Sequence, residues 1–299
     1  MNTKTPVPDV SVVIATYNMG QYLGAALSSV LQQSVGDLEI HIVDDGSTDN
    51  TSQVVAPFLL DERVYYHRQE NAGQTKAKNV GVRAARGRYV GFCDADDLWD
   101  VDKLAVQLPI LDADPTIAVA YTRVRPMDKN GVLLPVTLFA EPSGAVTRPL
   151  FIENFIPFGT ALVRRSALEA VGGFDENLRM GIDWDLWLRL SVTYRFQAIP
   201  KETYFYRVWE GQMSKNWKGR FDSAFRIMSQ FETNHPTLID PLTRKTAYSL
   251  SYRNRAYARA QISGDVAGCI RDCIRSVRAG GAFWPALKVA LRSAAPSVR

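Results

Sequence analysis

The segment Gly87–Lys103, GRYVGFCDADDLWDVDK, joins a short apolar run to a cluster of acids. The uncharged run Tyr89–Cys93 has the length and character of a buried strand. Asp94, Asp96 and Asp97 follow at its carboxyl end. Because like charges repel and burial disfavours charged groups, such a cluster is costly without a partner. A divalent cation held by carboxylate oxygens would offset that cost, and an acidic turn that caps the next helix is the alternative.

The chain before this segment repeats a strand followed by a helix. Val10–Ala15 and Glu39–Val43 are β-rich apolar runs, and Val64–His67 is a shorter one. Helical spacing of apolar residues follows the first two, and a basic helix over Lys76–Arg86 precedes the acids. This rhythm predicts an α/β fold with a mainly parallel sheet flanked by helices.

Polar residues stand where three of these strands end. Tyr17, Asp45 and the pair Asp94 and Asp96 each come just past a predicted strand. In open parallel sheets, ligands bind outside the carboxyl ends of the strands. We therefore expect these side chains to meet at one edge of the sheet, which helix capping alone would not explain.

A second acidic segment opens a helix later in the chain. Asp183 and Asp185 stand near its start, with Trp184 and Trp187 at helical spacing. The helix dipole favours acids at such a position, so a purely structural role would account for both. The tryptophans could stack on a ligand, but aromatic residues at this spacing are more typical of a core.

From Trp217 onward the pattern is helical, which predicts an α/β domain over residues 1–215 and a helical extension over residues 216–299. Cys269 and Cys273, four positions apart, are expected to pack on one helix face. The segment Phe283–Leu291 has an apolar side with basic neighbours. It is predicted either to lie in a membrane interface or to pack against the first domain.

Composition favours a soluble globular protein, with 299 residues, 46% hydrophobic and 22% charged. No apolar run approaches the roughly 18 residues of a membrane span, and the first ten residues lack an apolar signal core, so we expect a cytoplasmic protein. Three cysteines without paired spacing predict reduced thiols and no zinc site. Three histidines are scattered without ligand spacing, at His41, His67 and His235.

Charge is uneven along the chain. The net charge is +4, yet residues 253–299 hold nine Lys or Arg and only two acids. This bias points to an acidic partner, such as an anionic membrane surface contacted peripherally at the inner face of the membrane, but a solvated helical face is the commoner explanation of such a bias. Nucleic acid is not expected, because the basic residues form no recognisable binding motif. Nothing in the sequence indicates the number of subunits.

Six motifs in order resemble the family 2 glycosyltransferases of the GT-A fold. They are SVVIATYN, VDDGSTDNT, NAGQTKAKNVGVRAARG, FCDADDLW, GTALVRRSALEAVGGFDE and DWDLWLRL. The resemblance covers roughly residues 10–214 and not the helical tail. It implies a Rossmann-like GT-A catalytic domain that moves a sugar from a nucleotide-diphosphosugar, with a UDP-sugar favoured, to an acceptor hydroxyl with inversion.

The resemblance implies donor-side roles for several of these residues. Tyr17 would lie against the base, and Asp45 would accept a hydrogen bond from the base edge. Lys78 would lie near the nucleotide and its phosphates. Asp94 would lie near the ribose, and Asp96 would coordinate Mn²⁺ or Mg²⁺ across the diphosphate.

On the acceptor side, the resemblance makes Asp183 the catalytic base. A carboxylate there would take the proton of the attacking hydroxyl, and one direct displacement would invert the anomeric carbon. Trp184 and Asp185 are weaker candidates for contact with the acceptor. Close neighbours remain alternatives for three roles, namely Asp44 for Asp45, Lys76 or Arg83 for Lys78, and Asp185 for Asp183.

Two positions depart from the family pattern. The base is often preceded by Glu in this family, and here the residue is Ile182. Members often carry Arg-x-His after the aromatic strand, and here Trp209 takes the place of the His. Arg207 remains and can reach phosphate as a bidentate donor. The departure at Trp209 puts in question the metal affinity of the site and the closure of the loop Trp209–Lys215 over the donor.

The expected function is sugar transfer to a sugar or lipid-linked acceptor in cell-surface polysaccharide or glycolipid synthesis. One alternative is a nucleotidyltransferase, which would need a basic phosphate loop near the first strand, and Ala15–Gly20 has no basic residue. The other is a sugar-nucleotide-binding protein with impaired catalysis. The retained carboxylates Asp94, Asp96 and Asp183 argue against it.

Overall fold

The structure, a computed structural model, describes residues 7–136, 140–282 and 288–289. The chain divides into two compact units. Unit 1 comprises Met1–Val146 and Phe155–Glu210, and unit 2 comprises Thr147–Asn154 and Gly211–Arg299. Unit 2 thus includes a short segment from the middle of the sequence, which a linear reading does not indicate.

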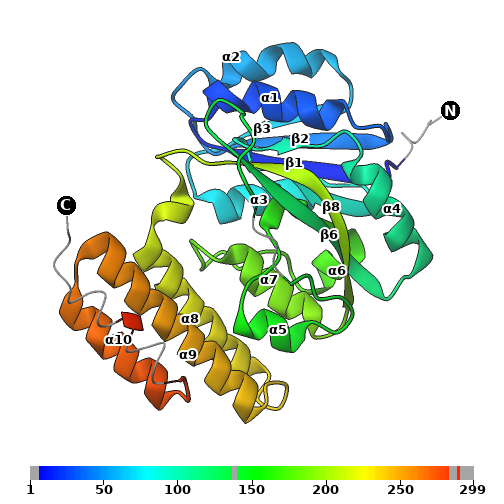
Figure 1. The fold of residues 1–299 in the computed structure, drawn as a ribbon. Helices are drawn as coiled ribbons and strands as arrows, with labels where there is room; N and C mark the ends of the chain where they lie inside the picture. The colour runs from blue at the N-terminus through cyan, green and yellow to red at the C-terminus, as the bar shows by residue number, and fades with distance from the viewer. Residues whose placement is uncertain (1–6, 137–139, 283–287, 290–299) are drawn as a thin grey trace. The chain divides into compact units, whose positions relative to one another are not determined.

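Unit 1 is built on an eight-stranded sheet with the order β3-β2-β1-β4-β7-β6-β8-β5 (Figure 1). The first four strands in sequence are β1 (Val10–Thr16), β2 (Leu38–Asp44), β3 (Val64–Arg68) and β4 (Tyr89–Phe92). They pair in parallel, as the sequence predicts. Every residue of β2 is buried, which explains why this parallel strand reads as an apolar run.

The second half of the sheet is mixed. The remaining strands are β5 (Leu98–Trp99), β6 (Ile117–Met127), β7 (Ala161–Arg164) and β8 (Arg195–Arg207). β7 runs antiparallel to both β4 and β6, whereas β6 and β8 are parallel. β5 pairs with β8 at the edge, antiparallel. The acidic residues therefore connect a central strand, β4, to the edge strand β5.

Helices cover both faces of the β1–β3 part of the sheet (Figure 1), with α1 and α2 on one side and α3 on the other. The helices of unit 1 are α1 (Gly20–Leu31), α2 (Thr51–Val55), α3 (Gln74–Ala84), α4 (Lys103–Ala113), α6 (Arg165–Ala170) and α7 (Ile182–Ser191). Two 3-10 turns, Ala56–Leu60 and Phe158–Thr160, complete it. The helix that follows the acidic residues begins at Lys103, because Leu98–Trp99 is extended and pairs with β8.

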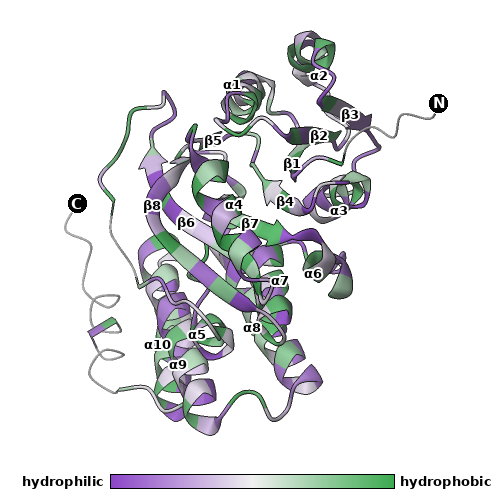
Figure 2. Cartoon of the chain, turned by 90° about the vertical axis from the view of Figure 1, so that its right-hand side faces the viewer, coloured by the Kyte–Doolittle hydropathy of each residue, from purple (hydrophilic) through white to green (hydrophobic). Residues whose placement is uncertain are grey.

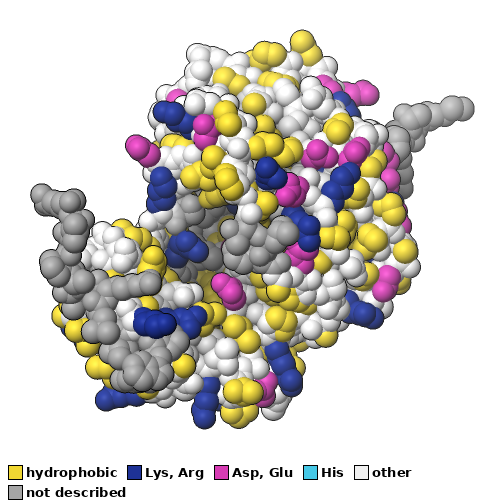
Figure 3. All heavy atoms as spheres, viewed as in Figure 1, with side chains coloured by type: hydrophobic (Ala, Val, Ile, Leu, Met, Phe, Trp, Pro, Cys, Tyr) yellow, Lys and Arg dark blue, Asp and Glu magenta, His cyan; other side chains and the backbone are white. Residues whose placement is uncertain are grey.

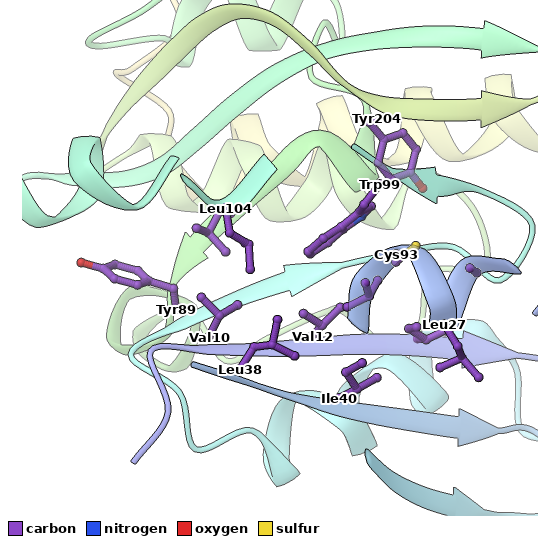
Figure 4. Packing of buried hydrophobic residues seen from close by; sticks show 14 of the residues in the cluster. Val10, Val12, Leu27, Leu38, Ile40, Tyr89, Cys93, Trp99, Leu104 and Tyr204 are labelled. Carbon is purple, nitrogen blue, oxygen red and sulfur yellow. The ribbon is translucent and has the colours of Figure 1, made fainter. Parts of the chain in front are cut away.

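The core of unit 1 forms where these layers meet. Figure 4 shows Cys93, Trp99 and Tyr204 close together beyond the end of β4. Each of these side chains is at most 3% exposed. The residue that precedes the acids is therefore fixed by packing, so the acids start from a rigid position.

Unit 2 is helical. Its elements are α5 (Thr147–Ile152), the 3-10 turn Met213–Lys215, α8 (Trp217–Asn234), α9 (Pro241–Ala258), the π-turn Arg259–Ser263 and α10 (Val266–Arg278). Asp240 caps α9 by accepting from two backbone N–H groups, and Asp265 caps α10. α8, α9 and α10 carry hydrophobic and hydrophilic residues in alternation (Figure 2), as amphipathic helices do.

A buried ion cluster joins α9 to α10. Asp272 is 1% exposed and accepts a bidentate pair of hydrogen bonds from Arg255 and a third bond from Arg259. Cys269 and Cys273 are buried beside it as free thiols, which confirms their predicted packing.

Most of the segment Phe283–Leu291, predicted to lie at a membrane or to pack on the first domain, falls outside the described residues. Among the helices of the described part, none combines the length and apolar character needed to cross a bilayer. The predicted boundary at residue 215, between an α/β domain and a helical extension, stays a prediction.

Candidate functional site

Asp97 holds the acidic turn, residues Asp94–Asp97, against β8. It is 1% exposed, and its two carboxylate oxygens accept 2.7 Å hydrogen bonds from the Tyr204 hydroxyl and the Arg207 backbone N–H. Burial and repulsion from Asp96 and Asp94 raise the pKa of Asp97 well above its usual range. This acid therefore shapes the turn instead of facing a ligand.

Asp94 pairs with a lysine from α3. Nζ of Lys78 lies 3.0 Å from Oδ1 of Asp94 and 3.9 Å from the centre of the Phe158 ring. Lys78 is 6% exposed, whereas the Asp94 side chain is 35% exposed. The structure thus brings two predicted donor-side residues into direct contact, with a buried cation behind a more open carboxylate.

Asp96 is bonded by the residue that departs from the family pattern. Nε1 of Trp209 donates a 2.8 Å hydrogen bond to Oδ2 of Asp96. Burial and the charge of Asp94 raise the pKa of Asp96, and the indole N–H opposes that shift by stabilising the charged form. A cation at this point would relieve the same repulsion.

The side chain of Arg207 supports the turn by bonding to backbone carbonyls. Its Nε donates a 2.7 Å hydrogen bond to the carbonyl of Asp96, and its Nη1 donates to the carbonyl of Lys129 at 3.0 Å. The guanidinium lies 4.7 Å from the centre of the Tyr22 ring and is 5% exposed. Because the side chain is buried and bonded to carbonyls, the predicted phosphate contact of Arg207 gains no support from its position.

Asp45 fixes the loop that leads into α3. Its Oδ1 accepts hydrogen bonds from Gln69 and from the Ala72 N–H, and its Oδ2 accepts from the Gly73 N–H at 2.8 Å. Gly73 has a φ of 93°, a conformation that glycine adopts most readily. Asp45 therefore lies at the predicted sheet edge, next to the loop before Lys78.

The alternative residue, Asp44, is also bonded on both oxygens. It accepts from the Ser47 N–H at 2.8 Å and from the Tyr66 hydroxyl. Both acids at the end of β2 hold neighbouring loops, so the choice between them for contact with a base stays a prediction.

The loop after β1 is locked to the loop after β2. Asn18, with a φ of 53°, accepts hydrogen bonds from the N–H groups of Thr48 and Asp49 and donates its own N–H to Ser47. Asn is one of the few residues other than Gly that tolerate this backbone region. Tyr17, directly before it, is 47% exposed. About half of this residue is therefore accessible to solvent.

Asp183 lies in the first turn of α7 and is half-buried. The helix starts after Gly181, which has a φ of 70°, and Ile182 is buried where the family often carries Glu. Trp184 and Trp187 are 8% and 0% exposed. The tryptophans belong to the core, as their spacing suggests, so the stacking role predicted for Trp184 gains no support.

Asp185 forms an ion pair within α7. Its Oδ2 accepts hydrogen bonds of 2.6 and 2.8 Å from Arg189, which also donates to the carbonyls of Val171 and Gly173. Burial raises the pKa of Asp185, and Arg189 opposes that shift. Asp185 therefore braces the turn before α7, which weighs against it as acceptor contact or alternative base.

The segment that leads to Asp183 lies along α3. Asn79 exchanges two hydrogen bonds with the backbone of Phe174, and the Thr75 hydroxyl donates to the carbonyl of Leu178 at 2.7 Å. These contacts place the approach to α7 beside the helix that supplies the lysine of the acidic turn. Sequence reasoning missed Asn79 and Thr75, although both lie within one of the quoted motifs.

The acidic turn offers few protein ligands for a metal. Among the described residues, no three His, Cys, Asp or Glu side chains are arranged to hold an ion. Asp94 and Asp96 each have one carboxylate oxygen beyond the one bonded to Lys78 or Trp209. Two carboxylates fit Mg²⁺ or Mn²⁺, which take hard oxygen ligands and leave positions for phosphates.

Known proteins resemble this chain in sequence. The family model described as Glycosyl transferase family 2 matches residues 11–172. A chondroitin synthase of Escherichia coli is 32% identical, covering 66% of this chain and 29% of its own length. An uncharacterised glycosyltransferase of Nostoc is 40% identical, covering 67% of this chain and 64% of its own length. The chain spans only about 20–38% of the first several relatives.

Solved structures share the fold. Staphylococcus aureus TarS 1-349 in complex with UDP-GlcNAc is 20% identical with a TM-score of 0.70, covering 91% of this chain and 81% of that one. A mannosyltransferase from Pyrobaculum calidifontis in complex with GDP-Man and Mn²⁺ is 22% identical with a TM-score of 0.59, covering 97% and 87%. At these identities the likeness establishes the fold alone.

Proposed function

The chain belongs to glycosyl transferase family 2 and has the GT-A fold, and from this premise we propose that it moves a sugar from a nucleotide-diphosphosugar to an acceptor hydroxyl with inversion. The observation that carries the proposal is the grouping of Lys78, Asp94 and Asp96 beyond β4. The nucleotide-sugars in the names of two structural neighbours, UDP-GlcNAc and GDP-Man, support this donor class, and we favour a UDP-sugar.

We propose that the loops after β1 and β2 bind the nucleotide. The exposed ring of Tyr17 would stack on the base, as amphipathic aromatic rings do. Asp45 uses three of the roughly four acceptor positions of a carboxylate, which leaves one for a base N–H. Lys78 would face the diphosphate once the donor draws Asp94 toward the ribose.

Asp96 is the residue that would hold a divalent cation, Mn²⁺ or Mg²⁺, with Asp94 in the same turn. When bound, such an ion supplies charge stabilisation for the departing diphosphate. The protein contributes the rigid turn beneath it, since Asp97, Tyr204 and Arg207 fix the main chain. That rigidity matters because a preorganised site spends no free energy on reorganising during reaction.

Asp183 is the proposed base. The acceptor oxygen would form a bond to the anomeric carbon while the bond from that carbon to the diphosphate oxygen breaks, and the hydroxyl proton would pass to Asp183. A single displacement of this kind inverts the carbon and needs no enzyme nucleophile. Asp183 lies in the first turn of α7, where the helix dipole favours a negatively charged group.

The proposed setting is cell-surface polysaccharide or glycolipid synthesis, with a sugar or lipid-linked acceptor. Relatives named as chondroitin synthase and hyaluronan synthase support a polysaccharide. Lys and Arg side chains (dark blue in Figure 3) lie on the visible face of unit 2, which supports peripheral contact with an anionic membrane.

One observation favours the alternative of a donor-binding protein with impaired turnover. Trp209 occupies one oxygen of Asp96, where other family members often carry His. Donor hydrolysis separates the two functions, because a binding protein would take up the nucleotide-sugar without releasing free sugar.

The test is a thermal-shift screen of UDP-, GDP- and dTDP-sugars, each with and without Mn²⁺. A ligand at a hundredfold excess over its Kd should raise the free energy of unfolding by about 2.7 kcal/mol. We expect a metal-dependent rise in melting temperature for one nucleotide, lost in Asp96→Ala and kept in Glu62→Ala, which removes an exposed carboxylate. The absence of any rise with all three would contradict the proposal.

A further inference from the structure

Trp209 contacts the acidic turn through its indole N–H and packs through its ring. Nε1 lies 2.8 Å from Oδ2 of Asp96. The indole ring lies 5.8 Å from the ring of Tyr22 on α1, and the Arg207 guanidinium lies 4.7 Å from that same ring. Tyr22 therefore supports both residues that reach the turn from the end of β8.

The spacing of Arg207 and Trp209 explains why they act on one turn. Residues two apart in an extended chain point to the same face. Val208 between them continues the pairing, since its N–H donates to the Met127 carbonyl at 2.8 Å. Arg207 thus holds the main chain of Asp96, while Trp209 holds its carboxylate.

The chemistry of this contact differs from that at Asp94. Lys78 is a cation that offsets the charge of Asp94, whereas an indole is a neutral donor and leaves the negative charge of Asp96 in place. The contact fixes the rotation of the carboxylate without neutralising it. A metal ligand needs both a full charge and a fixed orientation.

We propose that Trp209 is a positioning residue that orients the Asp96 carboxylate for a divalent cation, with the Tyr22 ring as its support. The proposal rests on the proposed function, because it concerns the same metal. It assigns to Trp209 a role made by this chain's own residues, at a position where the family pattern has a different side chain.

The test measures Mn²⁺ binding, by the electron paramagnetic resonance signal of free Mn²⁺, with UDP, GDP or dTDP present. Trp209→Phe keeps the ring and loses the N–H, so the fold and the Tyr22 contact should survive with an unchanged melting temperature. Partners that orient metal ligands are typically worth roughly 10- to 100-fold in affinity, and we expect a loss of about that size. Trp217→Phe removes an indole N–H from unit 2 and should bind Mn²⁺ as the wild type does.

Two further measurements make the outcome decisive. Trp209→Leu removes the aromatic ring as well as the N–H and should lose no more Mn²⁺ affinity than Trp209→Phe, whereas a purely packing role predicts a larger loss. The indole ¹H–¹⁵N signal that disappears in Trp209→Phe should broaden when Mn²⁺ is added, since that N–H lies on the carboxylate.

Asp96→Ala distinguishes the failure of this inference from failure of the proposed function. If Asp96→Ala abolishes Mn²⁺ binding and Trp209→Phe binds within about twofold of wild type, the positioning role is wrong and the metal site stands. If Asp96→Ala also binds as wild type does, the metal site itself is wrong.

Discussion

Tyr204 donates a 2.7 Å hydrogen bond to Oδ2 of Asp97, and both side chains are buried. The same hydroxyl accepts from the Asp94 N–H at 3.3 Å, so one phenol holds the acidic turn at two points. Room for the ring exists only because residue 159 is Gly, since a Cβ there would lie 2.0 Å from Cζ of Tyr204. The shape of the turn thus depends on a residue with no side chain.

Gly159→Ala should displace Tyr204 and loosen the turn. Overpacking of this kind costs about 1–3 kcal/mol, which urea unfolding would measure. Sugar transfer should fall further than stability alone explains, because Asp97 and Asp94 lose their common partner. Gly36→Ala is the matched control, since a Cβ at Gly36 meets nothing within 4 Å. Equal activity in the two variants would refute this dependence.

Asp183→Asn should lower kcat and leave donor binding intact. Removing a general base typically costs roughly 10²- to 10⁴-fold in rate, and Asn keeps the size of the side chain. Initial rates of sugar transfer would measure the loss, and the thermal shift with donor would check binding. Asp185→Asn should act differently and lower the melting temperature, because it breaks the pair with Arg189. A wild-type kcat in Asp183→Asn would rule out the proposed base.

A lysine is fully buried behind the acidic turn. Nζ of Lys103 donates to Oε1 of Gln107 and to the carbonyl of Thr160, and lies 4.6 Å from the centre of the Trp99 ring. Burial lowers its pKa from 10.5 to about 7. Burial also raises the pKa of the nearby Cys93 thiol well above its usual range.

Lys103 should make stability rise with pH. Between about pH 7 and 10.5 the unfolded chain binds a proton at this lysine that the folded chain has released, so alkali favours folding. One proton gives a slope of up to about 1.4 kcal/mol per pH unit. Lys103→Met should flatten the slope in urea unfolding between pH 7 and 9, whereas Lys129→Met, at an exposed site, should keep it. A slope unchanged in Lys103→Met would show that the buried lysine is not its source.

Asp272→Ala should destabilise unit 2. Its removal leaves Arg255 and Arg259 without the carboxylate that both contact. Breaking one side of a buried ion pair costs about 3–5 kcal/mol. The midpoint of urea unfolding would measure this loss, and Glu153→Ala, an exposed acid of the same unit, should leave the midpoint in place. Similar midpoints for both variants would mean that the ion cluster adds nothing.

Local sequence determines the first half of the sheet. β1, β2 and β4 were predictable because parallel strands buried on both faces read as apolar runs followed by turn residues. β3 lies at the edge of the sheet and is largely only half-buried, and it was predicted as a shorter β-rich run. β5 was not, because two residues carry no period and only their pairing with β8 makes them a strand. Short α5 packs against α9, and its Phe151 packs against Phe231 of α8. Neither contact could be predicted from the local sequence.

In the candidate site, too, some contacts were predictable from the sequence and others were not. Lys78 and Asp94, which were both given donor-side roles from the sequence, are in contact, and Asp96 lies two positions further along the same turn. The roles of Arg207 and Trp209 depend on contacts more than a hundred positions away, and no pattern reports these. His41 and His67 seemed scattered, yet their rings lie side by side across β2 and β3, with Nδ1 and Nε2 3.1 Å apart.

The pairing of β5 with β8 has a consequence for the order of assembly. Tyr204 lies 107 positions after Asp97. At about 5–20 residues per second, a ribosome takes roughly 5–20 s to make that interval. Strands β1 to β4 can pair during that time, but Asp97 gains its partners Tyr204 and Arg207 only after β8 has been synthesised. A nascent chain that stops before Arg195 therefore carries every acid of the turn but lacks the contacts from Tyr204, Arg207 and Trp209 that hold Asp97 and Asp96.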